Sequence, residues 1–465
     1  MRIQPIFFTI LVASSSFFIS CKKNTEVLAT PPPATGAGSG SSGTASGGFN
    51  VDLLKDTALM YAKDVYLWNS QIPATFNARS YADPAAIMKA IQTYSLEPGF
   101  SQPVDKWSFA MKKTEWDQMS NGMSSTTIGS NGDFGLSVFF RSEGDLRIRL
   151  VEPNSPAGLA GVRRGWRITQ INGNSNLTTG NASTIINDVY YSTSSSFTFT
   201  KPDGSSISKS FTAMHYTEKP VYLDSVYDMG SKKIGYLVYN SFLGNTTDIS
   251  TKFQQVFSRF AAKQVTDVII DLRYNGGGYV SLAEQLANYL APASANGGLM
   301  MKQQYNSQNT QNNSTTYFQK RGTLNLPTIY FIVSKSSASA SELLINTLKP
   351  YMNVKLIGPS ATHGKPVGFF PISDGDWYVF PVSFRTMNKL GEGNYFNGLL
   401  LTAQVADGLD KDWGDVSESC LASAIRNITT GAFMPDRNEY KEQPIVDAGN
   451  VELDAPFLKI TVDKK

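Results

Sequence analysis

The sequence predicts a mixed α/β protein in which a helical region and a region of short strands precede a core of alternating strands and helices. From residue 221 onward, apolar runs of strand length alternate with amphipathic runs of helix length. Residues 50–123 instead show helical spacing, and residues 124–218 show short strands separated by turns. Alternation of strands and helices is typical of a sheet covered by helices, so we place the core at residues 219–430.

Residues 1–21 indicate a targeting segment. Arg2 supplies a positive start, and an apolar stretch at 6–19 is too short to cross a bilayer, so it is typical of a signal peptide. The segment ends in F-I-S-C, which resembles the lipobox of bacterial lipoproteins and implies acylation of Cys21. A chance cysteine after a standard signal is the alternative. We expect a lipoprotein anchored to the membrane of a bacterial cell envelope, facing the periplasm or the exterior.

A Gly/Ser/Pro-rich stretch at residues 22–49 follows the signal and predicts a disordered linker. Charge and composition then exclude several functions. The 465 residues carry a formal charge of +3 and are 41% hydrophobic, which argues against large-scale disorder and gives no basic patch for nucleic acid. With Cys21 acylated, Cys420 stays alone, so we expect no internal disulfide. No cluster of metal ligands stands out, and we predict neither a metal nor a cofactor.

The helical region at residues 50–123 shows apolar residues at steps of three and four, from Leu54 through Ala58 and Tyr61 to Val65. We expect this helix to end at Pro73 and a second helix to cover residues 87–94. The region shows no chemistry in its sequence, so packing is its predicted role.

The strand region at residues 124–218 contains S-P-A-G-L-A-G-V-R-R-G-W-R-I-T-Q-I-N-G, beginning at Ser155. This series resembles a PDZ domain. The resemblance implies that the loop before the strand of Gly135, Leu136 and Ser137 binds the C-terminal carboxylate of a peptide, which adds to the sheet edge. The alternative is a structural module whose peptide groove is closed by its neighbours.

A glycine run follows the most apolar strand of the core. Residues 268–273 read V-I-I-D-L-R and continue Y-N-G-G-G, which is not the G-x-G-x-x-G of a dinucleotide site. Consecutive glycines let backbone N–H groups approach a reacting carbonyl closely.

A serine run and a lysine turn carry the candidate chemistry. Residues 336–344 read S-S-A-S-A-S-E-L-L, and residues 362–368 read T-H-G-K-P-V-G. Ser339 at a helix start and Lys365 after the next strand would form a nucleophile and its base. The plainer interpretation of Ser339 is a helix-capping box with Glu342. The plainer interpretation of Lys365 is a solvated surface residue. His363 is a rival base. A phosphate loop is excluded because Pro366 stands where Ser or Thr would bind magnesium.

The serine run, the lysine turn and D-L-R-Y-N-G-G-G resemble the C-terminal processing peptidases, or tail-specific proteases, which are Ser/Lys enzymes. The resemblance implies the β/α spiral core of the ClpP/crotonase-like fold, with Ser339 as nucleophile and Lys365 as base. It also implies an oxyanion hole formed by the N–H of Ala340 and that of Gly277 or Gly278. Several relatives carry a glutamine four residues after the lysine. Phe369 stands there instead, so a dyad is predicted.

The end of the core departs further from these relatives. Thr402 and Ala403 replace their usual proline and acid. Residues 413–425 predict the last core helix, and residues 431–465 form a C-terminal extension without an assigned role.

We therefore expect a serine endopeptidase that cleaves proteins or peptides and recognises their C-terminal tails through the PDZ domain. Two alternatives stay open. One is a peptide-binding lipoprotein scaffold with an inactive peptidase core, which the missing glutamine at Phe369 permits. The other is a surface lipoprotein that binds cell-wall or glycan material.

Overall fold

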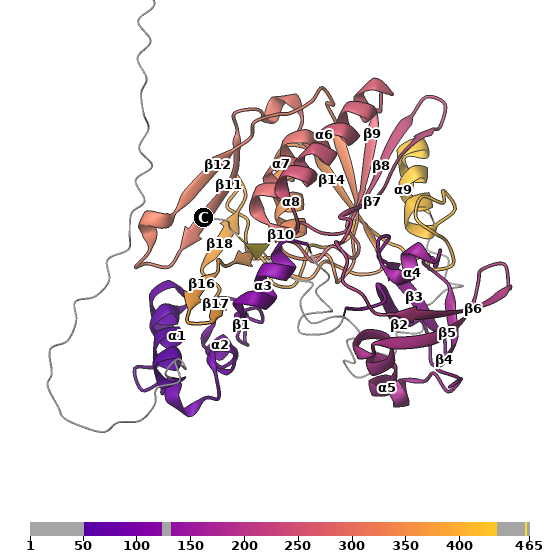
Figure 1. The fold of residues 1–465 in the computed structure, drawn as a ribbon. Coiled ribbons are helices and arrows are strands. Elements are labelled where there is room, and N and C mark those ends of the chain that lie inside the picture. Colours follow the sequence, from indigo (N-terminus) through magenta and orange to yellow (C-terminus); the bar gives the residue numbers. More distant parts are fainter. Residues whose placement is uncertain (1–50, 123–131, 435–460, 463–465) are drawn as a thin grey trace, which may run out of the picture. The chain divides into compact units, whose positions relative to one another are not determined.

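A six-stranded sheet forms the centre of the core in this computed structural model, which describes residues 51–122, 132–434 and 461–462 (Figure 1). The strand order is β19-β14-β13-β9-β8-β7, and every neighbouring pair is parallel except β7 with β8. The strands are β7 (Val221–Asp228), β8 (Lys233–Tyr239), β9 (Asp267–Asp271), β13 (Thr328–Ile332), β14 (Asn353–Gly358) and β19 (Ala403–Gln404).

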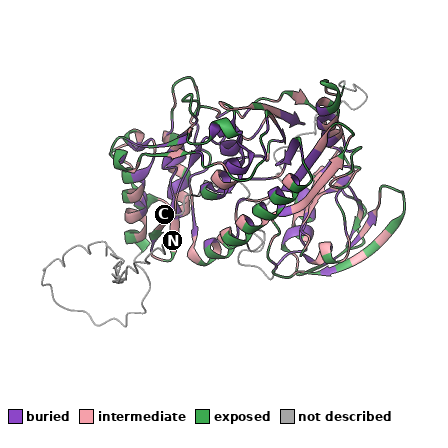
Figure 2. Ribbon diagram, turned by 90° about the horizontal axis from the view of Figure 1, so that it is seen from above, coloured by how far each residue is buried: buried purple, intermediate pink, exposed green. Residues whose placement is uncertain are grey.

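Helices cover both faces of this sheet because its strands are apolar on both sides. Along β8, Leu237 faces α6 (Thr246–Ala262), α7 (Val280–Leu290) and α8 (Ala340–Leu348), whereas Tyr236 faces α9 (Ser419–Thr430). Helix α6 is buried on the side toward the sheet and exposed on the other side, whereas every residue of α8 is buried. Figure 2 shows buried and exposed residues along the ribbon.

The N-terminal region contains the helices α1 (Val51–Val65), α2 (Pro84–Ile91) and α3 (Lys113–Ser120). It also contributes a strand that the sequence did not predict. This strand, β1 (Phe109–Lys112), pairs with β17 (Trp377–Phe380), which in turn pairs with β16 (Ile372–Asp374). The short F-A-M-K segment shows no strand pattern of its own, so its partner far along the chain determines its structure.

The strand region forms a five-stranded antiparallel sheet with the order β2-β3-β4-β5-β6. Its elements are β2 (Leu136–Phe140), β3 (Leu146–Val151), α4 (Pro156–Leu159), β4 (Arg167–Ile171), α5 (Ala182–Ile186), β5 (Ser194–Thr200) and β6 (Ser206–Thr212). A hydrophobic core of its own, separate from that of the six-stranded sheet, fills this region.

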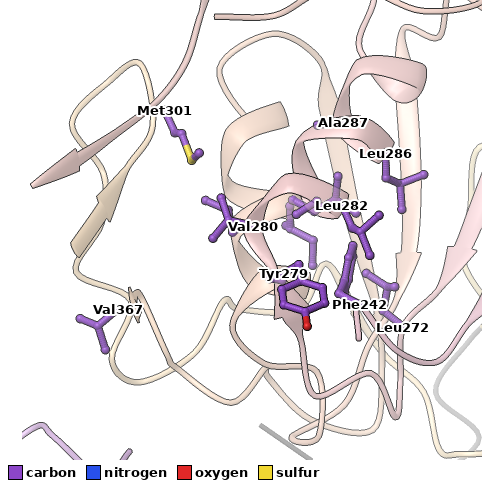
Figure 3. Close-up of a cluster of buried hydrophobic side chains, with 14 of the residues drawn as sticks. Phe242, Leu272, Tyr279, Val280, Leu282, Leu286, Ala287, Met301 and Val367 are labelled. Atoms are coloured by element: carbon purple, nitrogen blue, oxygen red, sulfur yellow. The ribbon is translucent and has the colours of Figure 1, made fainter. Parts of the chain in front are cut away.

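Two smaller sheets complete the core. One has the order β12-β11-β18-β15, with β11 (Leu299–Tyr305), β12 (Ser314–Tyr317), β15 (Val367–Gly368) and β18 (Phe384–Met387). The other pairs β10 (Gly278–Tyr279) with β20 (Thr461–Val462) in parallel. Figure 3 shows the packing around β10: Tyr279, Val280 and Leu282 lie beside Phe242 and Leu272.

The predicted mixed α/β fold with a helical N-terminal region is confirmed. The last helix begins later than predicted, at Ser419, because the carboxylate of Glu418 accepts the N–H of Leu421 and caps it there. The predicted signal peptide, Cys21 and linker lie outside the described residues. Within the described ranges, no helix is long and apolar enough to cross a membrane, and no group of metal-ligating side chains could hold an ion.

Candidate active site

The serine run joins β13 to α8, and Ser339 stands at the helix start in a strained conformation. Its φ of 65° and ψ of −114° lie outside the regions that residues other than glycine favour. Strained backbone of this kind persists only where the surroundings impose it, and it is concentrated at functional sites. A helix cap alone does not require this strain, because capping residues usually have extended backbone.

The three alternating serines of the run differ in what their hydroxyls do. Ser337 donates to the carbonyl of Leu272 at 2.7 Å, and Ser341 donates to the carbonyl of Asn275 at 3.0 Å. The Oγ of Ser339 is buried and donates no hydrogen bond to a described residue; it faces the backbone N–H of Glu342 in a capping box whose geometry is too poor for a full hydrogen bond. A buried polar atom without a partner costs free energy, and a nucleophile that awaits a substrate is one reason to keep it.

Asn275 holds the glycine run against the serine run. Its carbonyl accepts the N–H of Ala338 at 3.1 Å as well as the Ser341 hydroxyl, and its Nδ2 donates to the carbonyl of Tyr239 at 2.9 Å. Gly277 donates its N–H to Asn275 Oδ1 at 2.9 Å. The two loops predicted to build the oxyanion hole are therefore adjacent, and the Gly277 N–H already has an acceptor inside the chain.

Only glycine fits at the end of this run. Gly277 and Gly278 have φ values of 107° and 138°. A Cβ at Gly278 would lie 2.3 Å from the carbonyl carbon of Phe242, which is closer than real contacts allow. The run is thus fixed by the segment before α6 on one side and by the serine run on the other.

Glu342 joins the serine run to the lysine turn. One carboxylate oxygen accepts the backbone N–H groups of Ser339 and Lys365, each at 2.8 Å, so these two nitrogens lie no more than twice that distance apart. The other oxygen accepts the Thr362 hydroxyl and the Gly364 N–H, each at 2.6 Å. Burial raises the pKa of Glu342, while these four donors oppose the rise. The predicted capping residue therefore also positions the lysine turn.

Lys365 is buried, with an exposed fraction of 1%, so the solvated alternative is wrong. Burial lowers its pKa to about 7, even though the negative charges of Asp105 and Glu342 favour the ammonium form. Its Nζ lies 4.1 Å from the ring centre of Phe369 and 5.9 Å from that of Trp107. A lysine with this pKa is largely neutral slightly above pH 7, which a general base requires.

His363 lies two residues before Lys365. Its Nε2 accepts a hydrogen bond from the indole Nε1 of Trp107 at 3.1 Å, and its backbone N–H donates to the carbonyl of Ser337 at 2.9 Å. Because Nε2 is the acceptor for an indole N–H, it is not available as a base in this arrangement.

A buried ion network lies directly before the glycine run. Arg273 binds Asp271 at 2.7 Å, Glu418 at 2.8 Å and Asp407 at 2.6 Å. Arg164, from the five-stranded sheet region, also binds Asp407. Burial alone would raise the pKa of Asp407, but the two guanidinium groups outweigh it and keep the pKa well below its usual range. The network connects the strand region to the base of the glycine run.

Of the residues predicted to bind a peptide, Gly135 lies just before β2, and Leu136 and Ser137 lie in it; β2 is an edge strand of its sheet. Two backbone donors near this edge already have acceptors: Gly135 donates to Asp133 Oδ1 at 2.7 Å, and Val138 donates to the hydroxyl of Tyr190 at 3.0 Å. Leu136 is buried, and Ser137 Oγ accepts from Arg149 at 2.9 Å. These contacts favour the closed-groove alternative for this conformation.

The sequence did not reveal Asp105, Trp107 or Arg164 as neighbours of the site. All three come from regions predicted to lie outside the core, and nothing in their local sequence marks them. Strand β20 was also missed: its backbone pairs with β10 next to the glycine run. Asn275 was within the D-L-R-Y-N motif, but its role as a bridge was not predicted.

Comparison with known proteins shows which proteins this chain resembles. Residues 233–381 match the model of peptidase family S41. The chain is 27% identical over 243 residues to a probable CtpA-like serine protease of Staphylococcus aureus, which covers 51% of this chain. It is 25% identical over 294 residues to the carboxy-terminal processing protease CtpB of Bacillus subtilis, which covers 58% of this chain.

The chain spans about half the length of the curated relatives it matches, 46% of the first and 54% of the second. A solved structure of a putative S41 protease from Bacteroides fragilis has the same fold. The match has a TM-score of 0.66 at 22% identity and covers 80% of this chain and 97% of that one. The similarity to processing peptidases inferred from the sequence motifs is confirmed, whereas the roles of individual site residues stay predictions.

Proposed function

We propose that this chain is a serine endopeptidase in which Ser339 is the nucleophile and Lys365 is the general base. The observation that carries the proposal is the hydroxyl of Ser339. It is buried and its proton has no acceptor among the described residues, whereas the hydroxyls of Ser337 and Ser341 both donate to backbone carbonyls. Glu342 supports the pairing because it binds the backbone of both residues through one oxygen.

In the first step, Ser339 Oγ attacks the scissile carbonyl carbon and its proton moves to the neutral amine of Lys365. The carbonyl oxygen becomes an oxyanion. The ammonium of Lys365 then gives the proton to the leaving amine, which departs as the C–N bond breaks and an acyl-enzyme remains. Water attacks this ester with Lys365 again as base, which releases the acid and restores Ser339.

The oxyanion needs N–H donors at the point where its charge develops. Ala340 is the first residue of α8, and the N–H groups of a first helical turn have no acceptor within the helix. Gly277 would be the second donor. Its N–H must leave Asn275 Oδ1 to reach the oxyanion, so substrate binding would have to shift this hydrogen bond.

Cleavage of an unstructured peptide by the wild type and by Ser339→Ala tests the proposal. We expect the variant to lose at least about a thousandfold in kcat/KM while keeping its fold, since the lost oxygen makes no full hydrogen bond with a described residue. Ser337→Ala and Ser341→Ala are the matched controls and should retain cleavage, although each loses a buried hydrogen bond. Equal activity of Ser339→Ala and wild type would exclude the mechanism. A wild type without any cleavage would favour the inactive scaffold.

We further propose that the β2 edge recognises the C-terminal tails of substrates, which requires the N–H groups of Gly135 and Val138 to leave their acceptors on Asp133 and Tyr190. The support is the PDZ-like sequence and the edge position of β2, and the curated relative from Bacillus subtilis is described as a carboxy-terminal processing protease. A peptide with a free C-terminal carboxylate should bind more tightly than its amide. Equal affinity of the two peptides would identify the sheet as a structural module.

Attachment to a membrane through Cys21 is also a proposal. Its support is the short apolar segment that ends in F-I-S-C and the polar linker behind it. Cys21→Ala should move the protein out of the membrane fraction or leave its signal uncleaved. Unchanged attachment and processing of this variant would argue against the lipid anchor.

A further inference from the structure

The amine of Lys365 lies against two aromatic rings that come from different parts of the chain. Its Nζ is 4.1 Å from the ring centre of Phe369, just after β15, and 5.9 Å from that of Trp107, just before β1. Both rings are buried, with exposed fractions of 1% and 9%. We propose that Phe369 and Trp107, which we call the aromatic pair, are positioning residues for the Lys365 amine. This inference rests on the proposed role of Lys365 as the base.

Neighbouring rings fix the orientation of Phe369. Phe109 meets it edge to face with ring centres 5.3 Å apart and planes at 73°, and Phe380 does so at 5.6 Å and 67°. Phe109 and Phe380 are a cross-strand pair of β1 and β17, stacked at 4.3 Å. Edge-to-face contacts of this kind are favourable and directional, so the Phe369 ring has little freedom to turn away from the amine.

Trp107 is held from three sides. Its indole N–H donates to His363, its ring stacks on Phe396 with ring centres 6.3 Å apart, and its backbone N–H donates to Asp105 at 2.8 Å. The N-terminal region thereby reaches the lysine turn. Its predicted role as packing alone is incomplete, because it supplies one face of the environment of the base.

The aromatic pair affects the protonation of the Lys365 amine as well as its position. The face of an aromatic ring attracts a cation but not a neutral amine, so the pair favours the ammonium form. Asp105 and Glu342 favour it too, while burial favours the neutral form. His363 is a further titratable group beside this site, since it hydrogen-bonds the indole of Trp107, whose ring the Nζ faces. Removing one ring should therefore lower the pKa of Lys365 further.

The variant Phe369→Leu tests this reasoning, since leucine keeps apolar bulk but has no π face. We expect the acidic limb of the pH profile of kcat/KM to move to lower pH by roughly half a unit to one unit. The kcat on the plateau should fall several-fold because the amine is less well oriented. Trp107→Leu should shift the limb in the same direction by less, since its ring is farther from Nζ. Phe253→Leu, a buried phenylalanine of α6, should leave the limb in place.

A second readout does not need activity. In Ser339→Ala protein carrying lysine labelled with ¹³C at the ε carbon, NMR titration reports the pKa of Lys365 directly, and its signal is assigned by its absence in Lys365→Met. Adding Phe369→Leu should lower this pKa. An unchanged or raised value would overturn the inference, whereas wild-type protein without cleavage would overturn the proposed function and leave this titration valid.

Discussion

Replacing Lys365 by methionine should abolish cleavage and stabilise the fold at the same time. Methionine has a similar length and no charge, so it fits the apolar surroundings of the aromatic pair. The native lysine is destabilising at neutral pH because folding must either bury an ammonium or remove its proton. If Lys365 served packing alone, Lys365→Met would instead lower the stability of the fold.

The size of this effect follows from the lowered pKa. Between about pH 7 and 10.5, the unfolded chain keeps the lysine proton and the folded chain has released it. The unfolded state therefore binds more protons, and the free energy of unfolding of the wild type rises with pH across this window, by about 1.4 kcal/mol per pH unit. Below pH 7 the buried lysine lowers the free energy of unfolding by its full amount, about 5 kcal/mol for a pKa that falls from 10.5 to about 7.

Urea unfolding of wild type and Lys365→Met at pH 6 and pH 9 measures the difference. The variant should be more stable at pH 6, and its advantage should be about 3 kcal/mol smaller at pH 9. Lys335→Met, at an exposed lysine before the serine run, is the matched control for the loss of a lysine without burial. An advantage of Lys365→Met that does not change with pH would refute the assignment of a buried lysine with a lowered pKa.

Three other predictions concern neighbours of the site. His363→Ala should lower kcat less than about tenfold, because it removes one hydrogen bond and no base; a loss as large as that of Lys365→Met would make the histidine the base. Tyr190→Phe should tighten binding of a C-terminal peptide by up to about tenfold, since it frees the Val138 N–H; unchanged affinity in a calorimetric titration would mean that the peptide does not use this donor. Removal of residues 435–465 should raise kcat/KM several-fold, because β20 occupies the edge of β10 beside the glycine run; unchanged kinetics would contradict this.

Local motifs allowed much of the site to be predicted. Consecutive glycines indicate a backbone that approaches another group closely, and this can be inferred from a single sequence. The order and spacing of the serine run and the lysine turn along the chain are also visible in the sequence. Val367 and Phe369, which closely follow Lys365, are apolar, as expected beside a desolvated lysine. The burial of Lys365 could therefore be predicted in part from the residues that follow it.

The rest depends on contacts between distant segments. Strand β1 pairs with β17, and this pairing together with the contacts of Trp107 to His363 and Phe396 brings Trp107 to the lysine turn. The partners of Gly135 and Val138 at the β2 edge depend on the side chains of Asp133 and Tyr190, which a motif match does not report. The start of α9 depends on the carboxylate of Glu418, which local apolar spacing did not identify.

Covalent labelling with a fluorophosphonate probe tests the central claim most directly. The probe reacts with an activated serine hydroxyl, and digestion followed by mass spectrometry identifies the modified residue. We predict a single modification at Ser339, lost in Lys365→Met because the hydroxyl then lacks its base. Labelling of Ser337 or Ser341 instead, or undiminished labelling of Ser339 in Lys365→Met, would contradict the Ser/Lys mechanism.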